Sequence, residues 1–101
     1  MAFGIDGFDW DDGNRAKCAK HGLSAEVIEG IFAGPVAVLP DEAHSRAERR
    51  FRAIGRTVAA RHVFIVFTLR EKDGEMLVRP ISARYMHKRE IEAYEEENPD
   101  V

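Results

Sequence analysis

The amino-acid sequence predicts an α+β domain in which helices pack on a single antiparallel sheet of three to four strands. Apolar residues between positions 12 and 33 recur at helical spacing, whereas those between 36 and 82 follow strand patterns. The dipeptide Asp73-Gly74, between two strand-like segments, is the strongest hairpin signal in the chain. Two N-terminal helices and one C-terminal helix are therefore expected around the sheet.

The two N-terminal helices have recognisable start and stop signals. The first runs from about residue 12 to residue 20, with Asp11 or Asp12 as its N-cap and Gly22 where a left-handed residue ends a helix. Ser24 offers an N-cap for the second helix, which stops before Gly34 and Pro35. Its apolar stripe is expected to face the core and consists of Val27, Ile28, Ile31 and Phe32.

Four segments rich in Val, Ile and Phe predict the strands. They span residues 36–39, 49–54, 62–69 and, after the Asp73-Gly74 turn, 75–82. The last two are expected to pair as an antiparallel hairpin, and a final helix over residues 88–97 is expected to turn Ile91 and Tyr94 towards the sheet. Since 101 residues with 45% hydrophobic content provide one modest core, residues 1–101 are expected to form one domain.

The net charge of −3 is unevenly distributed along the chain. Ten of the 18 acidic residues lie in residues 1–12 and 90–101, which contain no Lys or Arg. All 15 Lys and Arg lie in residues 13–89, which carry a net charge of +7. This basic body predicts a polyanion-binding surface as readily as a solvated one. Like charge makes residues 90–101 dispensable for binding a polyanion in this interpretation.

Membrane, metal and cofactor sites are not expected. No run approaches the roughly 18 apolar residues of a membrane span, so the chain is expected to act in the cytoplasm. The single cysteine, Cys18, has no partner for a disulfide and no companion at metal-ligand spacing. The four histidines also lack a recognised metal-ligand spacing; they are His21, His44, His62 and His87.

Several short motifs follow one another in a distinctive order over nearly the whole chain. They are Trp10-Asp11, Lys20-His21-Gly22, Ile54-Gly55-Arg56 ahead of the strand at 64–68, and Ile81-Ser82-Ala83-Arg84 ahead of a Glu-rich helix. In this order the motifs resemble the BrnT family of toxins. The resemblance implies a RelE-like fold and a metal-independent endoribonuclease that arrests growth. It also implies a cognate antitoxin, a small DNA-binding protein through which any contact with DNA is indirect.

Two alternatives to a ribonuclease remain at this point. The first is a non-catalytic module that binds a protein or a nucleic acid through the same basic body. The second is a metal-dependent hydrolase. Cleavage of RNA in the presence of EDTA distinguishes the ribonuclease from both alternatives.

Metal-free RNA cleavage needs a base near the 2′-hydroxyl, an acid near the leaving oxygen and cations around the phosphate. Arginines inside strand segments supply such cations, because a guanidinium binds two phosphate oxygens and stays charged. Imidazole exchanges protons near neutral pH, which makes His62 the candidate for proton transfer. We therefore expect Arg70, Arg84 and His62 to be catalytic. The alternative for each arginine is an ion pair with a carboxylate.

Four further residues are expected to bind RNA, namely Arg79, Tyr85, Lys20 and His21. Arg79 offers a cation to the backbone, and Tyr85 offers a ring on which a base can stack. Lys20 and His21 add positive charge at the end of the first helix. The structural alternative for His21 is an interaction with the dipole at that helix end.

The faces of the predicted hairpin depend on its register. If Asp73-Gly74 forms a two-residue turn, simple alternation predicts one polar face opposite the helices. That face carries His62, Thr68, Arg70, Arg79 and Tyr85. Arg84 then falls at the end of the covered face, whereas a bulge or longer loop at residues 71–75 moves it to the polar face. The sequence is compatible with both arrangements of Arg84.

Overall fold

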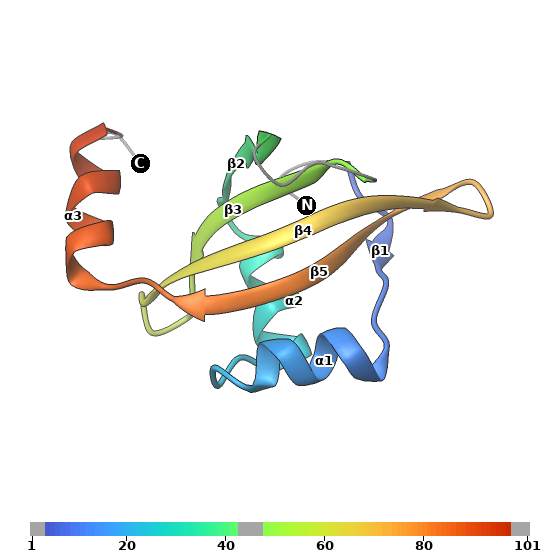
Figure 1. The fold of residues 1–101 in the computed structure, drawn as a ribbon, viewed down its shortest axis with the longest axis horizontal. Coiled ribbons are helices and arrows are strands. Elements are labelled where there is room, and N and C mark those ends of the chain that lie inside the picture. Colours follow the sequence, from blue (N-terminus) through green and yellow to red (C-terminus); the bar gives the residue numbers. More distant parts are fainter. Residues whose placement is uncertain (1–3, 43–47, 98–101) are drawn as a thin grey trace.

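The computed structural model describes residues 4–42 and 48–97, which form three helices and one five-stranded sheet (Figure 1). In chain order the elements are β1 (Gly7–Phe8), α1 (Asp12–Ala19), α2 (Ala25–Ala33), β2 (Ala37–Pro40), β3 (Arg50–Arg56), β4 (His62–Lys72), β5 (Glu75–Tyr85) and α3 (Lys88–Glu97). Helices α1 and α2 lie on one side of the sheet, and α3 extends beyond the end of β5 (Figure 1). The helix positions agree with those predicted.

The sheet is mixed, which corrects the expectation of three to four purely antiparallel strands. Across the sheet the strand order is β1-β5-β4-β3-β2, and the four strands β2 to β5 pair antiparallel as predicted. The fifth strand, β1, runs parallel to β5, where the backbone N–H groups of Asp6 and Asp9 donate to the carbonyls of Met76 and Val78 at 2.8 Å each. A two-residue strand has no periodic pattern, so the sequence did not reveal it.

Asn14 joins α1 to the sheet. The Asp11 carboxylate accepts from the Asn14 backbone N–H at 3.0 Å, and the Asn14 side-chain oxygen accepts from the Asp11 N–H at 2.7 Å, which forms a capping box. The Asn14 amide then donates to the carbonyls of Asp9 at 3.0 Å and Pro80 at 2.8 Å. With a side chain only 5% exposed, this asparagine fixes the start of α1 against β5.

The core lies between α2 and the covered face of the sheet. As predicted, Ser24 caps α2, and Ile28, Ile31 and Phe32 are buried. Val27, which was expected in the same apolar stripe, is instead 38% exposed. The Phe32 ring meets the ring of Phe67 edge-on, with centroids 5.2 Å apart. The helix approaches β3 so closely that a Cβ on Gly55 would lie 2.5 Å from an Ile31 methyl carbon. Any larger residue at this position would therefore force its neighbours, Ile31 first, to shift.

The hairpin between β4 and β5 has the two-residue turn that the sequence predicts. Lys72 pairs with Glu75, which leaves Asp73 and Gly74 as the turn. Both turn residues have positive φ, 52° for Asp73 and 81° for Gly74. This conformation is typical of type I′ hairpins and explains the Asp-Gly dipeptide.

A β-bulge interrupts the hairpin in its middle. Val66 pairs with Ser82, but the next residue of β4, Phe67, pairs with Pro80. Ile81 is therefore an extra residue in β5, and the strand changes the face of its side chains at this point. The bulge lies well away from residues 71–75, where the sequence analysis placed a possible irregularity.

The bulge corrects the predicted faces beyond Ile81. Arg84 pairs with Phe64 and turns away from α1 and α2, whereas Tyr85 pairs with Val63 and packs against the core. Simple alternation placed both residues on the opposite faces. The physical reason is packing, because the bulge lets the small side chain of Ala83, 2% exposed, fill the covered face.

The role of Asn14 predicts the effect of removing its amide. Asn14→Ala breaks the capping box and leaves the buried Pro80 carbonyl without its side-chain donor, so we expect the free energy of unfolding to fall by about 1–3 kcal/mol. Urea denaturation followed by circular dichroism measures the change. Lys17→Ala, at an exposed position of the same helix, is the control. Equal stability of the two variants would contradict the assigned role.

Candidate functional site

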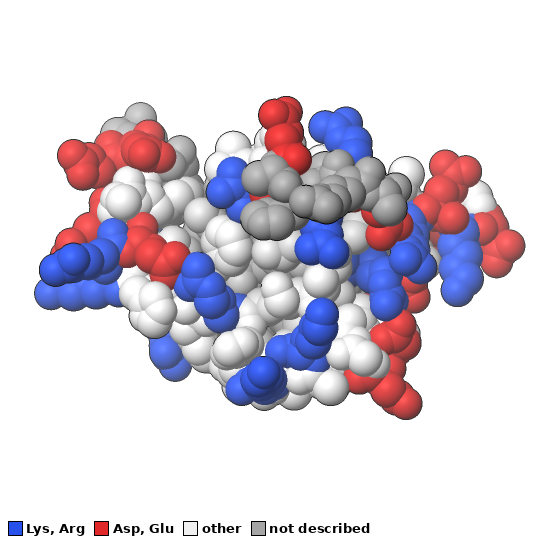
Figure 2. Space-filling model, in the orientation of Figure 1, with Lys and Arg blue, Asp and Glu red and all other residues white. Residues whose placement is uncertain are grey.

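The face of the sheet turned away from α1 and α2, here called the open face, is rich in arginine. Among the described residues it carries Arg50, Arg52 and Arg56 of β3, Arg70 of β4, and Arg79 and Arg84 of β5. His62 of β4 pairs with Arg56 and shares this face. In the view with β4 and β5 in front, Lys and Arg are spread across the face shown, including both of its ends, whereas Asp and Glu lie mainly around its periphery (Figure 2).

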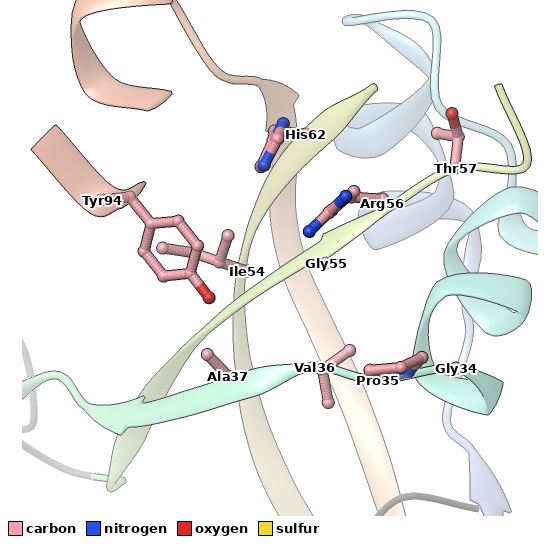
Figure 3. A pocket seen from close by; sticks show the side chains of 10 residues that line it. All are labelled: Gly34, Pro35, Val36, Ala37, Ile54, Gly55, Arg56, Thr57, His62 and Tyr94. Atoms are coloured by element: carbon pink, nitrogen blue, oxygen red, sulfur yellow. The ribbon is translucent and has the colours of Figure 1, made fainter. Parts of the chain in front are cut away.

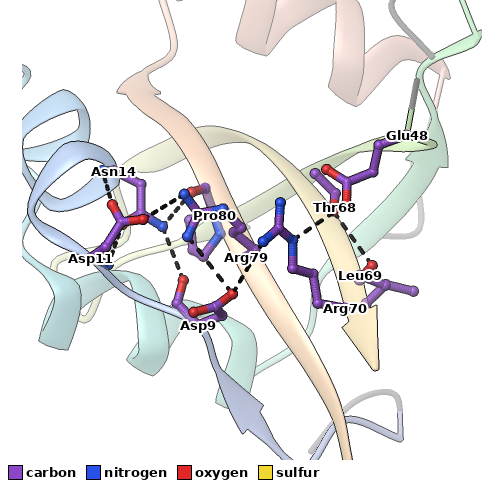
Figure 4. A network of polar contacts seen from close by, with 9 residues as sticks. All are labelled: Asp9, Asp11, Asn14, Glu48, Thr68, Leu69, Arg70, Arg79 and Pro80. Carbon is purple, nitrogen blue, oxygen red and sulfur yellow. Dashed lines mark hydrogen bonds and ion pairs between the residues drawn. The ribbon is translucent and has the colours of Figure 1, made fainter. Parts of the chain in front are cut away.

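Arg79 is ion-paired at the β1 edge of the open face (Figure 4). Its guanidinium lies 2.7 Å from the Asp11 carboxylate and 3.8 Å from that of Asp9. The backbone N–H of Asn14 and the Arg79 guanidinium together lower the pKa of Asp11 below its ordinary value. The acidic N-terminal segment therefore neutralises part of the basic face.

Arg70 lies beside the same acidic edge and is half-exposed. Its Nε atom lies 3.3 Å from a carboxylate oxygen of Glu48, and Nη1 lies 3.9 Å from Asp9 (Figure 4). Arg70 lies eight residue positions after His62 in β4, which is about 26 Å along a strand. Because an arginine side chain is much shorter than this, one phosphate cannot contact both residues. The structure thus separates two residues that the sequence analysis grouped as catalytic.

Arg84 lies nearer to His62 and binds the last helix. Two of its nitrogens donate to the two carboxylate oxygens of Glu90 in α3, each at 2.7 Å. The guanidinium also lies over the Phe64 ring, 4.9 Å from its centroid. Hydrogen bonds from Arg84 and from the His87 backbone N–H lower the pKa of Glu90 to about 2. The alternative of carboxylate pairing therefore applies to all three predicted arginines, Arg70, Arg79 and Arg84.

A hollow of about 760 Å³ opens at the end of β3 nearest α3 (Figure 3). Its lining residues are Gly34, Pro35, Val36, Ala37, Ile54, Gly55, Arg56, Thr57, His62 and Tyr94. The rings of His62 and Tyr94 meet edge-on with centroids 6.3 Å apart. The Arg56 guanidinium and the His62 imidazole thus border a mostly apolar lining.

Two buried nitrogen atoms of the open face have no hydrogen-bond partner within residues 4–42 and 48–97. They are Nε2 of His62 and Nε of Arg52. Buried polar groups without partners are uncommon in folded proteins, and they mark places where a ligand or water completes the structure. His62 lines the hollow, and Arg52 lies on β3 in the middle of the open face.

The remaining predicted binding residues lie elsewhere. Tyr85 packs on the covered side, where the Arg61 guanidinium stacks over its ring at 3.6 Å. Lys20 and His21 are exposed in the turn that follows α1, on the helix side of the sheet. The structure therefore brings His62, Arg79, Arg70 and Arg84 onto one face and excludes the other three.

The sequence analysis missed three arginines of the open face, Arg50, Arg52 and Arg56. Their spacing at even positions within one strand was the available signal, because alternate residues of a strand share a face. The predicted strand over residues 49–54 includes Arg50 and Arg52, whereas β3 continues to Arg56. They add cations to the middle of the open face and to the rim of the hollow.

Several other features bear on metal binding. Within the described ranges, no group of three or more His, Cys, Asp or Glu side chains is placed to hold a metal ion. His44 lies outside the described residues. Cys18 is buried in the core, and burial raises the pKa of its thiol. A buried, protonated thiol is a poor nucleophile and metal ligand.

A family model connects this geometry to a function. The family described as the ribonuclease toxin BrnT of type II toxin–antitoxin systems matches residues 10–90. The chain belongs to the BrnT family. It is a ribonuclease toxin, with RNA as substrate and a cognate antitoxin as partner. No curated protein matches the sequence.

The match to the BrnT family spans both ends of the open face. It includes all six arginines and His62, and it ends at Glu90, before Tyr94. Among the described residues, none of the helices has the length and apolar character needed to cross a membrane. The region that matches this ribonuclease family thus contains a basic surface that is compatible with phosphate binding.

The Glu90–Arg84 pair predicts a pH dependence for the position of α3. Because the folded-state pKa of Glu90 is lowered to about 2, its contribution is complete above the ordinary value near 4.5 and is lost as the pH falls towards 2. Ring resonances of His62 and Tyr94 in NMR spectra should report the release of α3 on acidification. Glu90→Gln should show the released spectrum already at pH 7.

Glu92→Gln is the control for this experiment, since Glu92 is exposed on the same helix and carries the same charge. We expect it to keep the wild-type spectrum at pH 7. Identical spectra of wild type and Glu90→Gln at pH 7 would show that the ion pair does not hold α3.

Proposed function

We propose that the open face binds the RNA substrate and that cleavage takes place without a metal beside His62. The observation that carries this proposal is the pairing of His62 with Arg56 at the rim of the hollow, two residues along β4 from the Arg84–Phe64 pair and on the same face. A proton-transfer group and two cations are thereby within reach of one phosphate. Diagonal neighbours on adjacent strands lie about 7–8 Å apart, a distance that an arginine spans.

The proposed reaction uses the 2′-hydroxyl of the RNA as its nucleophile. A base removes the 2′-proton, the 2′-oxygen bonds to phosphorus, and the bond from phosphorus to the 5′-oxygen breaks as that oxygen gains a proton. The products are a 2′,3′-cyclic phosphate and a 5′-hydroxyl. His62 transfers a proton in this scheme, and Arg56 and Arg84 stabilise the negative charge that builds on the phosphate oxygens.

Arg84 has enough donors to bind a phosphate while it holds α3. A guanidinium carries five N–H groups, of which Glu90 takes two and the Tyr85 carbonyl, at 3.4 Å, a third. Arg70 and Arg79 lie at the other end of the face, so we assign them to positioning the RNA backbone. Lys20, His21 and Tyr85 have no role in this proposal, because they lie on the helix side.

We also propose how the antitoxin blocks this surface. A cognate antitoxin, as a small DNA-binding protein, covers the open face with acidic side chains at the phosphate positions. Glu90 on Arg84 and Asp11 on Arg79 already illustrate carboxylates in such positions within the chain itself. The toxin then meets DNA only through its antitoxin, and it acts in the cytoplasm without membrane contact. The order of helices and antiparallel strands supports a RelE-like fold.

The division of the open face predicts different kinetic effects at its two ends. In an RNA cleavage assay with EDTA, Arg84→Ala should lower kcat by a factor of roughly 10²–10³, as removal of a charge-stabilising donor does. Arg70→Ala should mainly raise KM, since it is too far from His62 to reach the same phosphate. Arg15→Ala on the helix side is the matched control. Full activity of Arg84→Ala, or no cleavage in EDTA by the wild type, would contradict the proposal.

His62 is tested in the same assay through its pH profile. His62→Gln should lower kcat and flatten the dependence of the rate on pH near neutrality, because glutamine cannot exchange a proton. RNA binding should change little. An unchanged profile would remove His62 from the proton-transfer role.

The antitoxin proposal predicts that one substitution impairs both RNA cleavage and antitoxin binding. Arg56→Glu should reduce RNA cleavage and raise the Kd of the antitoxin complex at least about tenfold, because it reverses the charge of a shared contact. Arg15→Glu should do neither. Calorimetry with the purified antitoxin and the cleavage assay measure the two effects. Rescue of growth by an antitoxin that leaves RNA cleavage intact would contradict blocking of the open face.

A further inference from the structure

Helix α3 contributes no buried residue to the hydrophobic core. Its contacts include the Glu90–Arg84 ion pair, the edge-on contact between Tyr94 and His62, and the hydrogen bond that the His87 backbone N–H donates to Glu90. A helix with this attachment adds little apolar burial to the fold, so its position calls for another explanation.

The position of α3 places an aromatic ring over the hollow. Tyr94 lies above Ile54 and faces the open side of β3, with Ala37 beyond it (Figure 3). Residues 34–37 and 54–57 together with His62 form the rest of the surface that lines the hollow, and α3 contributes Tyr94 to it. Tyr94 converts this surface into a slot with an aromatic wall, an apolar floor and a rim of Arg56 and His62.

We propose that this slot is a nucleobase pocket, in which one unpaired base of the RNA stacks on Tyr94. This proposal rests on the proposed function, and it adds that the substrate is RNA with an unpaired base at the cleavage site. A nucleobase fits the lining because its two faces are apolar and its edge is polar. Each base is also linked to a phosphate, for which Arg56 stands at the rim beside His62.

The charge at the rim of the slot favours a nucleotide over an apolar protein side chain as its occupant. A cation and an imidazole at the rim favour a ligand that carries an anion beside a flat ring, and a nucleotide combines both groups. A base that is paired within a duplex cannot leave its stack at low cost. The pocket therefore selects RNA that is unpaired at the nucleotide beside the cleaved bond.

This inference gives α3 a function that its charge does not indicate. The five glutamates of the helix repel a phosphate backbone, and the sequence analysis treated residues 90–101 as dispensable on that ground. The Glu90–Arg84 pair instead holds α3 where Tyr94 meets the hollow. The remaining glutamates repel the phosphates of the RNA, which favours placement of the RNA backbone on the arginines of the sheet.

The test is steady-state cleavage of a short unstructured RNA. Tyr94→Ala should raise KM on the order of 10- to 100-fold, the usual effect of losing one stacking platform, with a smaller change in kcat. Tyr94→Phe keeps the ring and should recover most of the lost affinity. Glu92→Ala, an exposed position of the same helix, is the control for changes in helicity, which circular dichroism measures.

A second measurement observes the base directly. An RNA that carries 2-aminopurine at successive positions, with a 2′-deoxy sugar at the cleaved nucleotide, binds without being cut. Stacking on Tyr94 should quench the fluorescence of one 2-aminopurine position, and Tyr94→Ala should abolish this quenching. Annealing a complementary strand should prevent both quenching and cleavage of the ordinary RNA.

The outcomes separate this inference from the proposed function. Wild-type KM for Tyr94→Ala, together with a lowered kcat for His62→Gln, would overturn the pocket and leave the cleavage site intact. Cleavage of the duplex at the same bond would also overturn the pocket. If Tyr94→Ala weakens only the antitoxin complex, the slot belongs to the antitoxin and the inference is wrong. Loss of activity in EDTA by the wild type contradicts the proposed function alone, since the quenching experiment needs no cleavage.

Discussion

One extra residue in β5 determines which side chains reach the open face. The bulge at Ile81 turns Ala83 into the core and Arg84 out of it. Without it, a guanidinium would lie against Val63 and Ile65 with its charge buried, which is costly, and an alanine would face solvent. The placement of α3 depends on the same bulge, because Glu90 binds Arg84. A local backbone irregularity thus fixes both the cations and the helix beside the hollow.

The carboxylates around the open face moderate its charge. Asp9, Asp11 and Glu90 form ion pairs with Arg70, Arg79 and Arg84, so the face has a weaker field than its arginine content suggests. Such pairs also fix the guanidinium groups in place, which reduces the entropy lost when a phosphate binds. Exposed ion pairs in water contribute little net stability, so a phosphate can share or replace a carboxylate at small cost. Restraint of the arginines is therefore compatible with ligand binding.

Local signals of the sequence predicted most of the fold. Caps at Asp11 and Ser24 and the Asp73-Gly74 turn involve neighbouring residues, so short patterns identify them. Strand β1 and the Ile81 bulge depend on contacts between distant segments, which no short pattern contains. For the same reason the arginine-rich face was partly predictable from alternate spacing, whereas the carboxylate partner of each arginine and the exclusion of Tyr85 were not. The hollow also needed the fold, since its walls come from four separate segments.

Net charge bears on how such a chain selects RNA. At −3 overall, the protein does not attract a polyanion over long distances as a basic protein does, and salt screens whatever field its open face produces beyond about 8–10 Å. Recognition then depends on contacts made at short range. Paired arginines alone discriminate poorly among phosphates, because every nucleotide offers the same anion. A slot that accepts a base supplies the missing discrimination, since only a nucleotide free to leave its stack can place its phosphate on Arg56 and its ring on Tyr94 together.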